Sequence, residues 1–314
     1  MNPVDELKEK GLVTTVERIE SIAGMEPQCE GKSSWDCVLL SRRQGRPGAK
    51  QYIDLICDDF VELHGDRLYG DDQAMIGGIG TINGRAITFI GNRKGANFKE
   101  NVLCNYGMSN PEGYRKALRL AKQAEKFGRP VVCFIDTPGA YPGLGAEERG
   151  IGEAIARNLK EFSILKTPIL SFIIGEGGSG GALGIGVGDK LYMLENAVYS
   201  VITPEGFASI LLRDPSRAQE AAEAMKMTAR DLKSFNIIHD IIAEVPGGAS
   251  LDPGFTAKLI KQIIVRDLDT LCNKPEENLV RYRIKKIRGI GEYKGEKTWW
   301  EPLLRVFQQT DDLK

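Results

Sequence analysis

Two glycine-rich segments, Asp136–Gly143 and Gly175–Gly181, constrain the fold of this chain more than any other feature. Each follows a continuous apolar run, Val131–Ile135 in the first case and Ile169–Ile174 in the second, as buried parallel strands do. Clustered glycines let the backbone approach a ligand or another backbone closely, because no Cβ intervenes. The pattern therefore predicts two buried strands that end in two special turns.

Helical patterns alternate with these strands. Residues Glu112–Phe127 have helical spacing and stop at Gly128, and a second helix places apolar residues at spacings of four, four and three: Ile151, Ile155, Leu159 and Phe162. Strand, glycine turn and helix thus occur twice, which predicts an α/β fold with a parallel sheet. Ligands of such sheets collect at the carboxyl ends of the strands, where both turns are expected to be neighbours.

The rest of the chain is divided by weaker signals. We expect a helical arm over residues 1–32, a main domain over 33–265 and a helical, basic extension over 266–314. Within the extension, residues 281–297 carry seven Lys/Arg and two Asp/Glu, which indicates a solvated helix face or a contact for a phosphate-bearing or acidic partner. Further expected elements are a helix over Tyr52–Leu63, a hairpin of Met75–Ile82 and Ala86–Ile90, a loop over Gly91–Gly107, and short strands at Leu191–Leu194 and Val198–Ile202.

Composition narrows the class of protein. The formal charge of −1 argues against nucleic-acid binding by the chain as a whole. No apolar run approaches the roughly 18 residues that a membrane span needs. The N-terminal segment lacks the apolar stretch of a signal peptide, so we expect a cytoplasmic protein. The six cysteines form no C-x-x-C pair, so we expect no metal site. Only two histidines, His64 and His239, limit histidine-based catalysis.

The second glycine segment matches two unrelated motifs. Gly175–Gly180 fits the dinucleotide pattern G-x-G-x-x-G, with Glu195 twenty residues on, but the later glycines predict a poor helix there at about 1 kcal/mol each. Residues 177–181 also fit the nucleophile elbow G-x-S-x-G, which would make Ser179 the nucleophile of a hydrolase. The partners would then be His239 with Asp214 or Asp231.

Two further patterns are weaker evidence for a function. Asp136–Gly139 matches the D-x-x-G switch of GTPases, but the chain has no phosphate-binding G-x-x-x-x-G-K-[ST]. Glu147 and Glu148 could act as paired carboxylates, but adjacent helical residues point in different directions, and acidic residues are favoured early in a helix. The interpretation that uses both glycine turns is an oxyanion hole, in which unpaired N–H groups at a helix start stabilise an anion beside a carbonyl.

Six motifs in this order resemble the carboxyltransferase alpha subunits of multi-subunit acetyl-CoA carboxylases of bacteria and plastids. They are Met75–Ile79, Pro111–Leu120, Phe134–Gly143, Gly145–Gly150, Ile174–Ala182 and Tyr199–Gly206. The resemblance implies a crotonase/ClpP-like ββα spiral fold. It also implies transfer of a carboxyl group from carboxybiotin to acetyl-CoA, which gives malonyl-CoA for fatty acid biosynthesis.

The resemblance also implies partners and roles. The biotin would be carried by a biotin carboxyl carrier protein and loaded by biotin carboxylase, and a zinc-ribbon beta subunit would complete an α2β2 heterotetramer. Gly180 and Gly181 would donate N–H groups to an anion on the biotin ureido oxygen, with Gly139 and Ala140 as further donors. Gly177, Gly178, Tyr141 and Gly143 are expected to line the biotin site.

Overall fold

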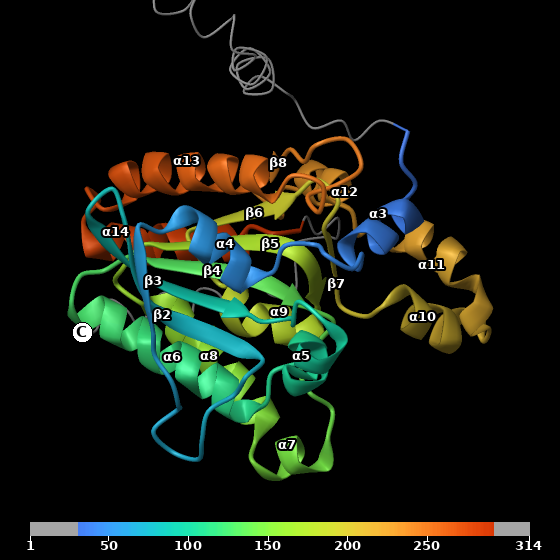
Figure 1. Cartoon of the computed structure of the whole chain (residues 1–314), viewed down its shortest axis with the longest axis horizontal. Coiled ribbons are helices and arrows are strands. Elements are labelled where there is room, and N and C mark those ends of the chain that lie inside the picture. The colour runs from blue at the N-terminus through green and yellow to red at the C-terminus, as the bar shows by residue number, and fades with distance from the viewer. Residues whose placement is uncertain (1–30, 292–314) are drawn as a thin grey trace, which may run out of the picture.

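The computed structural model describes residues 31–291, which are built on one eight-stranded mixed sheet (Figure 1). The predicted arm, apart from residues 31 and 32, and the extension beyond residue 291 lie outside the described residues. Seven strands follow each other in the spatial order β1 (Asp59–Glu62), β2 (Met75–Ile82), β3 (Arg85–Asn92), β4 (Val131–Thr137), β5 (Ile169–Gly178), β6 (Lys190–Leu194) and β8 (Asp240–Ile242). The eighth, β7 (Val198–Ser200), pairs with the last residues of β5.

The sheet begins antiparallel and becomes parallel. Strands β1, β2 and β3 form a meander, and Asn83 and Gly84 make the β2–β3 turn with positive φ, which confirms the predicted hairpin. From β3 onward every pairing is parallel, through β4, β5, β6 and β8. The carboxyl ends of β4 and β5 therefore meet at one edge of the sheet, as the sequence predicts.

Helices cover both faces of the sheet. Helices α4 (Ala49–Ile56) and α13 (Pro253–Leu271) lie on one face, and α6 (Pro111–Lys126), α8 (Ile151–Ile164) and α9 (Ser179–Gly186) lie on the other. Helix α14 (Glu276–Arg288) packs beside α8. Smaller helices are α3 (Ser34–Ser41), α5 (Phe98–Leu103), α7 (Leu144–Glu148), α10 (Pro204–Phe207), α11 (Ala218–Met225) and α12 (Ala229–Ser234).

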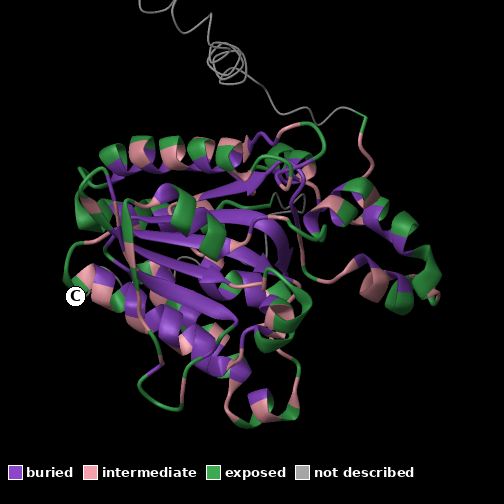
Figure 2. Cartoon of the chain, viewed as in Figure 1, coloured by how far each residue is buried: buried purple, intermediate pink, exposed green. Residues whose placement is uncertain are grey.

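The best predicted helix shows why local signals succeed where they are strong. Pro111 occupies the first turn of α6, where its missing N–H costs nothing, and Gly128 takes a positive φ just past the end. The core beside it is continuous, and the sheet is almost wholly buried in Figure 2. An aromatic row crosses β4, β5 and β6, where Phe134, Phe172 and Tyr192 are register partners with ring centroids 5.7 and 5.4 Å apart.

Two predictions in the first third of the chain are wrong. The helix expected over Tyr52–Leu63 ends with α4 at Ile56, and strand β1 follows. Residues Asp59–Glu62 form a strand because they pair with β2, and this pairing cannot be predicted from the local sequence. The loop expected over Gly91–Gly107 contains the end of β3, the helix α5 and the 3-10 turn Asn105–Gly107. Asn97 caps α5 by accepting a hydrogen bond from the Glu100 N–H.

The second glycine segment also differs from its prediction. Strand β5 continues through Gly175–Gly178 instead of ending at Ile174, because these residues pair with β4 and with β7. Residues Ser179–Gly186 form helix α9 despite four glycines. Burial against the sheet and α6 stabilises this helix where intrinsic propensity does not.

A short arm projects from the body of the molecule. It consists of residues 204–225 and contains α10, the π-helical turn Ala208–Leu212, the 3-10 turn Pro215–Arg217 and α11, seen at the right of Figure 1. Helix α11 packs against α3, which anchors the arm to the body. We refer to it as the α10–α11 arm.

Candidate functional site

The two glycine segments lie against each other at the carboxyl ends of β4 and β5. A Cβ built on Gly178 would lie 2.1 Å from the Pro138 carbonyl oxygen, and one on Gly181 would lie 2.4 Å from the Gly139 carbonyl carbon. Side chains never approach backbone atoms this closely, so both positions require glycine. The predicted proximity of the two turns is therefore confirmed, and the contact is backbone on backbone.

The start of α9 presents unpaired N–H groups beside this contact. Gly180 and Gly181 occupy the second and third positions of the helix, whose first N–H groups have no intrahelical acceptor. No side chain caps this end, and among the described residues neither N–H donates to a side chain or to a loop carbonyl. The helix dipole adds partial positive charge at the same point. An anion is the ligand that such an arrangement stabilises.

The first turn contributes one free donor and one occupied donor. The Gly139 N–H donates to the Thr137 Oγ1 at 3.1 Å, and this hydroxyl donates in turn to the Gly139 carbonyl at 2.6 Å. The Tyr141 N–H donates to the Ser109 carbonyl at 3.0 Å. Within residues 31–291 the Ala140 N–H has no acceptor, and its nitrogen lies 2.6 Å from the point that a Cβ on Gly181 would occupy. Of the two donors expected in this turn, Ala140 is the available one.

The other expected site residues fall into two groups. Gly177 and Gly178 are buried in the β5 ladder, where they pair with Tyr199 and Ser200 of β7. Tyr141 and Gly143 are half-buried at the rim, and the Tyr141 ring takes up the space that a side chain on Gly143 would need. The first pair belongs to the strand that precedes α9, and the second pair is partly accessible to solvent.

A network of charged side chains connects the two glycine segments. Lys94 Nζ lies 2.7 Å from Asp136 Oδ1 and 2.9 Å from Glu176 Oε2. Arg42 Nε lies 2.7 Å from the other oxygen of Glu176, and its Nη1 lies 2.6 Å from Glu205 of α10. Burial alone would raise the pKa of the Glu176 carboxyl, but Lys94 and Arg42 outweigh burial and lower it. The Glu176 carboxyl is therefore ionised at neutral pH.

Sequence reasoning missed this network, although a signal was present. Asp136 and Glu176 are charged residues inside otherwise apolar or glycine-rich runs, and both are buried. Buried carboxylates need cationic or hydrogen-bonding partners. The pattern could have predicted that partners exist, but it could not identify Lys94 and Arg42, which are far away in sequence.

The hydrolase interpretation is not supported. Ser179 lies at the carboxyl end of β5, whereas His239 accepts a hydrogen bond from the Leu191 N–H near the amino end of β6. Burial, with Lys286 and Lys190 nearby, lowers the pKa of His239 to about 4. Asp214 and Asp231 cap short helices of their own. Ser179 does have a positive φ of 51°, but no base stands beside it among the described residues.

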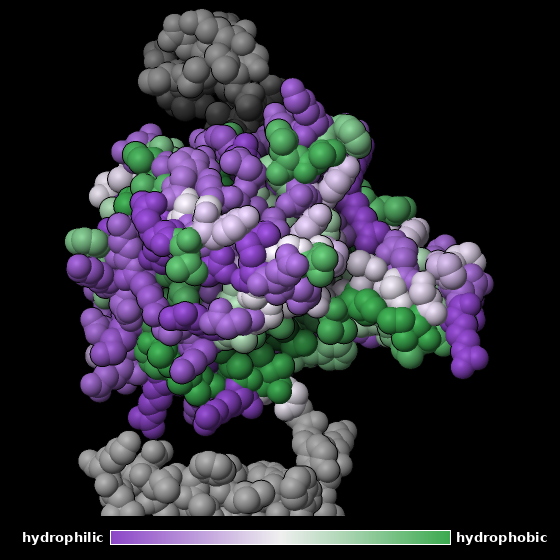
Figure 3. All heavy atoms as spheres, turned by 90° about the horizontal axis from the view of Figure 1, so that it is seen from below, coloured by the Kyte–Doolittle hydropathy of each residue, from purple (hydrophilic) through white to green (hydrophobic). Residues whose placement is uncertain are grey.

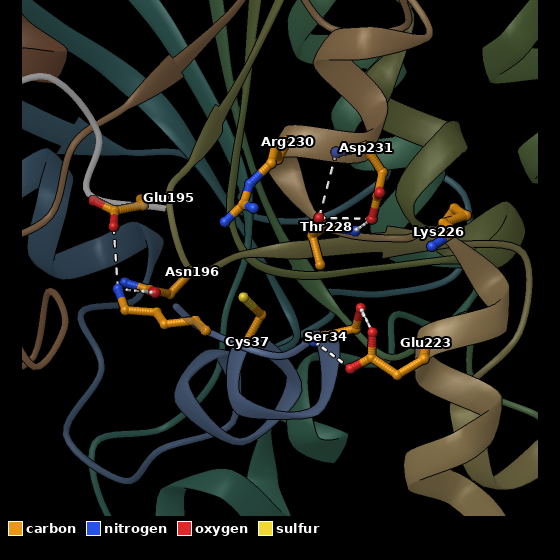
Figure 4. Close-up of a pocket in the computed structure, with 10 residues that line it drawn as sticks. Ser34, Cys37, Glu195, Asn196, Glu223, Lys226, Thr228, Arg230 and Asp231 are labelled. Atoms are coloured by element: carbon orange, nitrogen blue, oxygen red, sulfur yellow. Dashed lines mark hydrogen bonds and ion pairs between the residues drawn. The ribbon is translucent and has the colours of Figure 1, made fainter. Parts of the chain in front are cut away.

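The dinucleotide interpretation fails at its acidic residue. Glu195 is buried and accepts hydrogen bonds from Lys32 Nζ and from the Glu244 N–H, each at 3.1 Å, so its carboxylate has a structural role. It borders a polar hollow of about 180 Å³ between α3, α11 and α12, shown in Figure 4. The carboxylates drawn there bind neighbouring groups, as Glu223 does with Ser34, and the glycine segments are not part of its wall.

The paired glutamates and the basic segment also have structural explanations. Glu147 and Glu148 are exposed on the short helix α7, away from any partner that would make them an acid–base pair. In the basic segment, Arg283 is fully buried and donates to Asp189 at 2.8 Å and to three carbonyl groups, those of Phe162, Leu165 and Thr167. That arginine is part of the core, which neither interpretation of the segment anticipates.

Two features of residues 31–291 bear on other classes of function. No helix there is both long and apolar enough to cross a bilayer. The same range contains no group of three or more His, Cys, Asp or Glu side chains that could hold a metal ion.

Comparison with known proteins identifies the family of the chain. A family model described as "Acetyl co-enzyme A carboxylase carboxyltransferase-like" matches residues 7–291. The acetyl-coenzyme A carboxylase carboxyl transferase subunit alpha of Treponema denticola is 57% identical over 294 residues, which cover 93% of this chain and 96% of that protein. The protein of the same name from Halalkalibacterium halodurans is 52% identical over 92% of this chain and 89% of its own length.

Solved structures show the same fold at lower identity. A transcarboxylase 12S structure superposes with a TM-score of 0.60 at 19% identity and covers 87% of this chain. This chain spans about half of that one, 47% of its length. The beta subunit of Pseudomonas aeruginosa geranyl-CoA carboxylase gives a TM-score of 0.57 at 15% identity, with 80% of this chain and 46% of the other covered. The expected crotonase-like α/β fold is confirmed, and the chain belongs to the acetyl-coenzyme A carboxylase carboxyltransferase-like family.

Proposed function

We propose that this chain is the alpha subunit of a biotin-dependent acetyl-CoA carboxyltransferase. It would transfer the carboxyl group of carboxybiotin, carried by a biotin carboxyl carrier protein, to acetyl-CoA, and the malonyl-CoA formed would enter fatty acid biosynthesis in the cytoplasm. The observation that carries the proposal is the set of free N–H groups at Gly180, Gly181 and Ala140, in a chain that is 57% identical to a named alpha subunit.

The residues of the site fit a biotin ring. Glycine at 178 and 181 lets the two segments meet backbone against backbone, and the N–H groups at the start of α9 suit a carbonyl-type oxygen that gains negative charge. Bound carboxybiotin would supply the carboxyl group and the ureido oxygen. The N–H groups of Gly180 and Gly181 would donate to that oxygen, Ala140 would add a donor from the first turn, and Tyr141 would contact the ring from the rim.

Within residues 31–291 the site would contribute electrostatic stabilisation, and its ionisable groups offer no free general base. The ionisable groups beneath the glycine segments are Asp136, Glu176, Lys94 and Arg42, and each is held in an ion pair. A base must be free to take a proton and must reach the reacting atom. We infer that the chemistry at this site depends on fixed backbone dipoles.

The surface around the site supports a partner subunit. Large apolar side chains are at least 60% exposed on α5, on α7 and near the start of the α10–α11 arm: Phe98, Leu103, Leu144, Val201, Ile210 and Leu211. Figure 3 shows apolar residues gathered over this underside and along the arm. Contiguous apolar surface marks interaction sites. We infer that a zinc-ribbon beta subunit covers it, completes an α2β2 heterotetramer and binds acetyl-CoA opposite the glycine segments, with biotin carboxylase supplying the carboxylated carrier.

Reconstitution tests the proposal. The chain, a beta subunit, a carboxylated carrier protein and acetyl-CoA are mixed, and malonyl-CoA is measured by mass spectrometry. We expect product only when both subunits are present, and substitution of Leu144 and Ile210 by Asp should weaken co-purification of the beta subunit. Equal activity of the chain alone, or none in the complete mixture with an active beta subunit, would contradict the proposal.

A further inference from the structure

We propose that Lys94 and Arg42 are positioning residues that lock the two glycine segments together and couple them to the α10–α11 arm. The inference deepens the proposed function and rests on it for its kinetic test, whereas the geometric argument stands on the contacts alone. No described contact places either side chain among the free N–H groups, so both would act through the groups that they hold.

Lys94 joins the two segments through a single ammonium group. Its Nζ lies 2.7 Å from Asp136, the first residue of the first glycine segment, and 2.9 Å from Glu176, which lies within the second. The two carboxylates are only 4% and 11% exposed, and the Lys94 side chain is 21% exposed. An ion pair with so little solvent is screened far less than a surface pair. One side chain therefore sets the separation of two strand ends.

The carboxylates leave little freedom for adjustment. The Glu176 N–H donates to Asp136 Oδ1 at 3.0 Å, and a Cβ on Gly175 would lie 2.3 Å from the same oxygen. Asp136 thus packs into the space that Gly175 leaves open. Without the ammonium, two buried carboxylates would face each other and repel. The ends of β4 and β5 would separate, and Ala140 would move relative to Gly181.

Arg42 extends the same network to the arm. Its Nε binds Glu176 at 2.7 Å, and its Nη1 and Nη2 bind the two oxygens of Glu205 at 2.6 and 3.3 Å. Glu205 belongs to α10, and its side chain is 42% exposed, whereas that of Glu176 is 11% exposed. A planar guanidinium fixes the direction as well as the distance of its partners. The arm, which carries part of the apolar surface, is therefore tied to the second glycine segment.

Four variants separate this role from general stability. Lys94→Met removes the charge, and Lys94→Arg keeps it with altered shape. Arg42→Gln removes both carboxylate contacts without leaving Lys94 unpaired. Arg43→Gln is the matched control, because Arg43 is adjacent on the same stretch, is exposed, and binds only the Gly247 carbonyl.

Amide hydrogen exchange of the complete chain gives the first readout, and it needs no activity. Lys94→Met is expected to raise exchange about tenfold in peptides covering 137–143 and 176–182, and Lys94→Arg less. Arg42→Gln should raise exchange in 176–182 and in the arm while sparing 137–143. Exchange at the level of the Arg43→Gln control, or an equal rise throughout the sheet with a lowered melting temperature, would overturn the proposal. If Lys94→Met does not fold, Arg42→Gln carries the test.

Kinetics of the reconstituted complex give the second readout. For Lys94→Met we expect kcat to fall on the order of 100-fold, since small misplacements of donor groups have effects of this size, with KM for acetyl-CoA within about twofold of wild type. A changed KM with an unchanged kcat would overturn the positioning role. If the wild-type complex makes no malonyl-CoA, the proposed function fails, and the exchange experiment still decides this inference.

Discussion

At the carboxyl ends of β4 and β5 the backbone itself fills the space between neighbouring segments, whereas near the amino ends a side chain does so. The first region brings Gly178 and Gly181 against the Pro138–Ala140 turn. In the second, Arg283 from α14 donates to Asp189 and to three carbonyl groups around the start of β5, and Asp189 accepts the Ile169 N–H. Arg283 is buried, whereas the Pro138–Ala140 turn and Gly180 are half-buried.

This difference between the two ends of the strands separates residues that stabilise the fold from groups that are available to a ligand. A side chain such as Arg283 satisfies buried carbonyl groups and uses its donors within the protein. The start of α9 does the reverse, because its N–H groups stay free for a ligand. Substitutions at the amino ends should therefore change the free energy of unfolding, and those at the carboxyl ends should change catalysis.

The largest effect is expected for Arg283→Met. The change leaves Asp189 buried without its cation and three carbonyl groups without a donor, which should cost about 3–5 kcal/mol in the free energy of unfolding. Urea denaturation measures it, and Arg281→Met, an exposed position on the same helix, is the control. The comparison would break if the loss were below about 1 kcal/mol.

Gly181→Ala should affect catalysis more than stability. Its Cβ would meet the Gly139–Ala140 peptide at 2.4–2.6 Å and push the two segments apart. We expect carboxyl transfer by the reconstituted complex to fall on the order of 10²-fold, as when an oxyanion donor is lost. Gly152→Ala, at the second position of α8 with no heavy atom within 4 Å, is the control. Equal activity of the two variants would contradict this expectation.

His239 should make stability depend on pH without affecting the site. Its pKa is lowered to about 4 in the folded chain, first by burial and then by Lys286 and Lys190, and is about 6.5 when unfolded. The unfolded chain therefore binds more protons between these values, so stability is present above pH 6.5 and is lost as pH falls toward 4. Since His239 is only partly buried, the loss is about 1–2 kcal/mol.

His239→Asn keeps an acceptor for the Leu191 N–H but removes the titration. Urea denaturation between pH 4.5 and 7.5 should give a shallower slope for this variant than for wild type. Parallel slopes would show that other groups cause the pH dependence.

Ser179→Ala should have the smallest effect. Ser179 is exposed, and its side chain makes no recorded hydrogen bond within the described part of the chain, so carboxyl transfer should stay within about twofold of wild type. A loss of several orders of magnitude, with labelling by a fluorophosphonate probe that the substitution abolishes, would revive a nucleophilic serine and break the assignment of the site to backbone groups.

The sequence predicted what local patterns determine. The β2–β3 hairpin, α6, β4 and the pairing of two glycine segments all follow from periodicity, capping residues and turn chemistry. It failed at β1 and at Gly175–Gly178, where strand structure depends on partners that are distant in sequence. Helix α9 forms against its intrinsic propensity because its neighbours bury it.

The backbone arrangement at the start of α9 was predicted in outline for the same reason, and its role in stabilising an anion stays a prediction. The N–H groups of Gly180 and Gly181 follow from a helix that begins after a strand, which the local sequence suggests. That the Gly139 N–H is occupied by Thr137 depends on a rotamer, and the ion pairs of Lys94 and Arg42 depend on tertiary contacts. No spacing rule contains that information.

The backbone contact between the glycine segments also limits how such a protein can diversify. Any side chain introduced at Gly178 or Gly181 collides with main-chain atoms, so the region cannot be tuned by gradual exchange of residues. New substrate preferences would have to arise in the surrounding shell or in a partner chain. An engineer seeking a different carboxyl acceptor should therefore vary the residues of the surrounding shell and leave both glycines untouched.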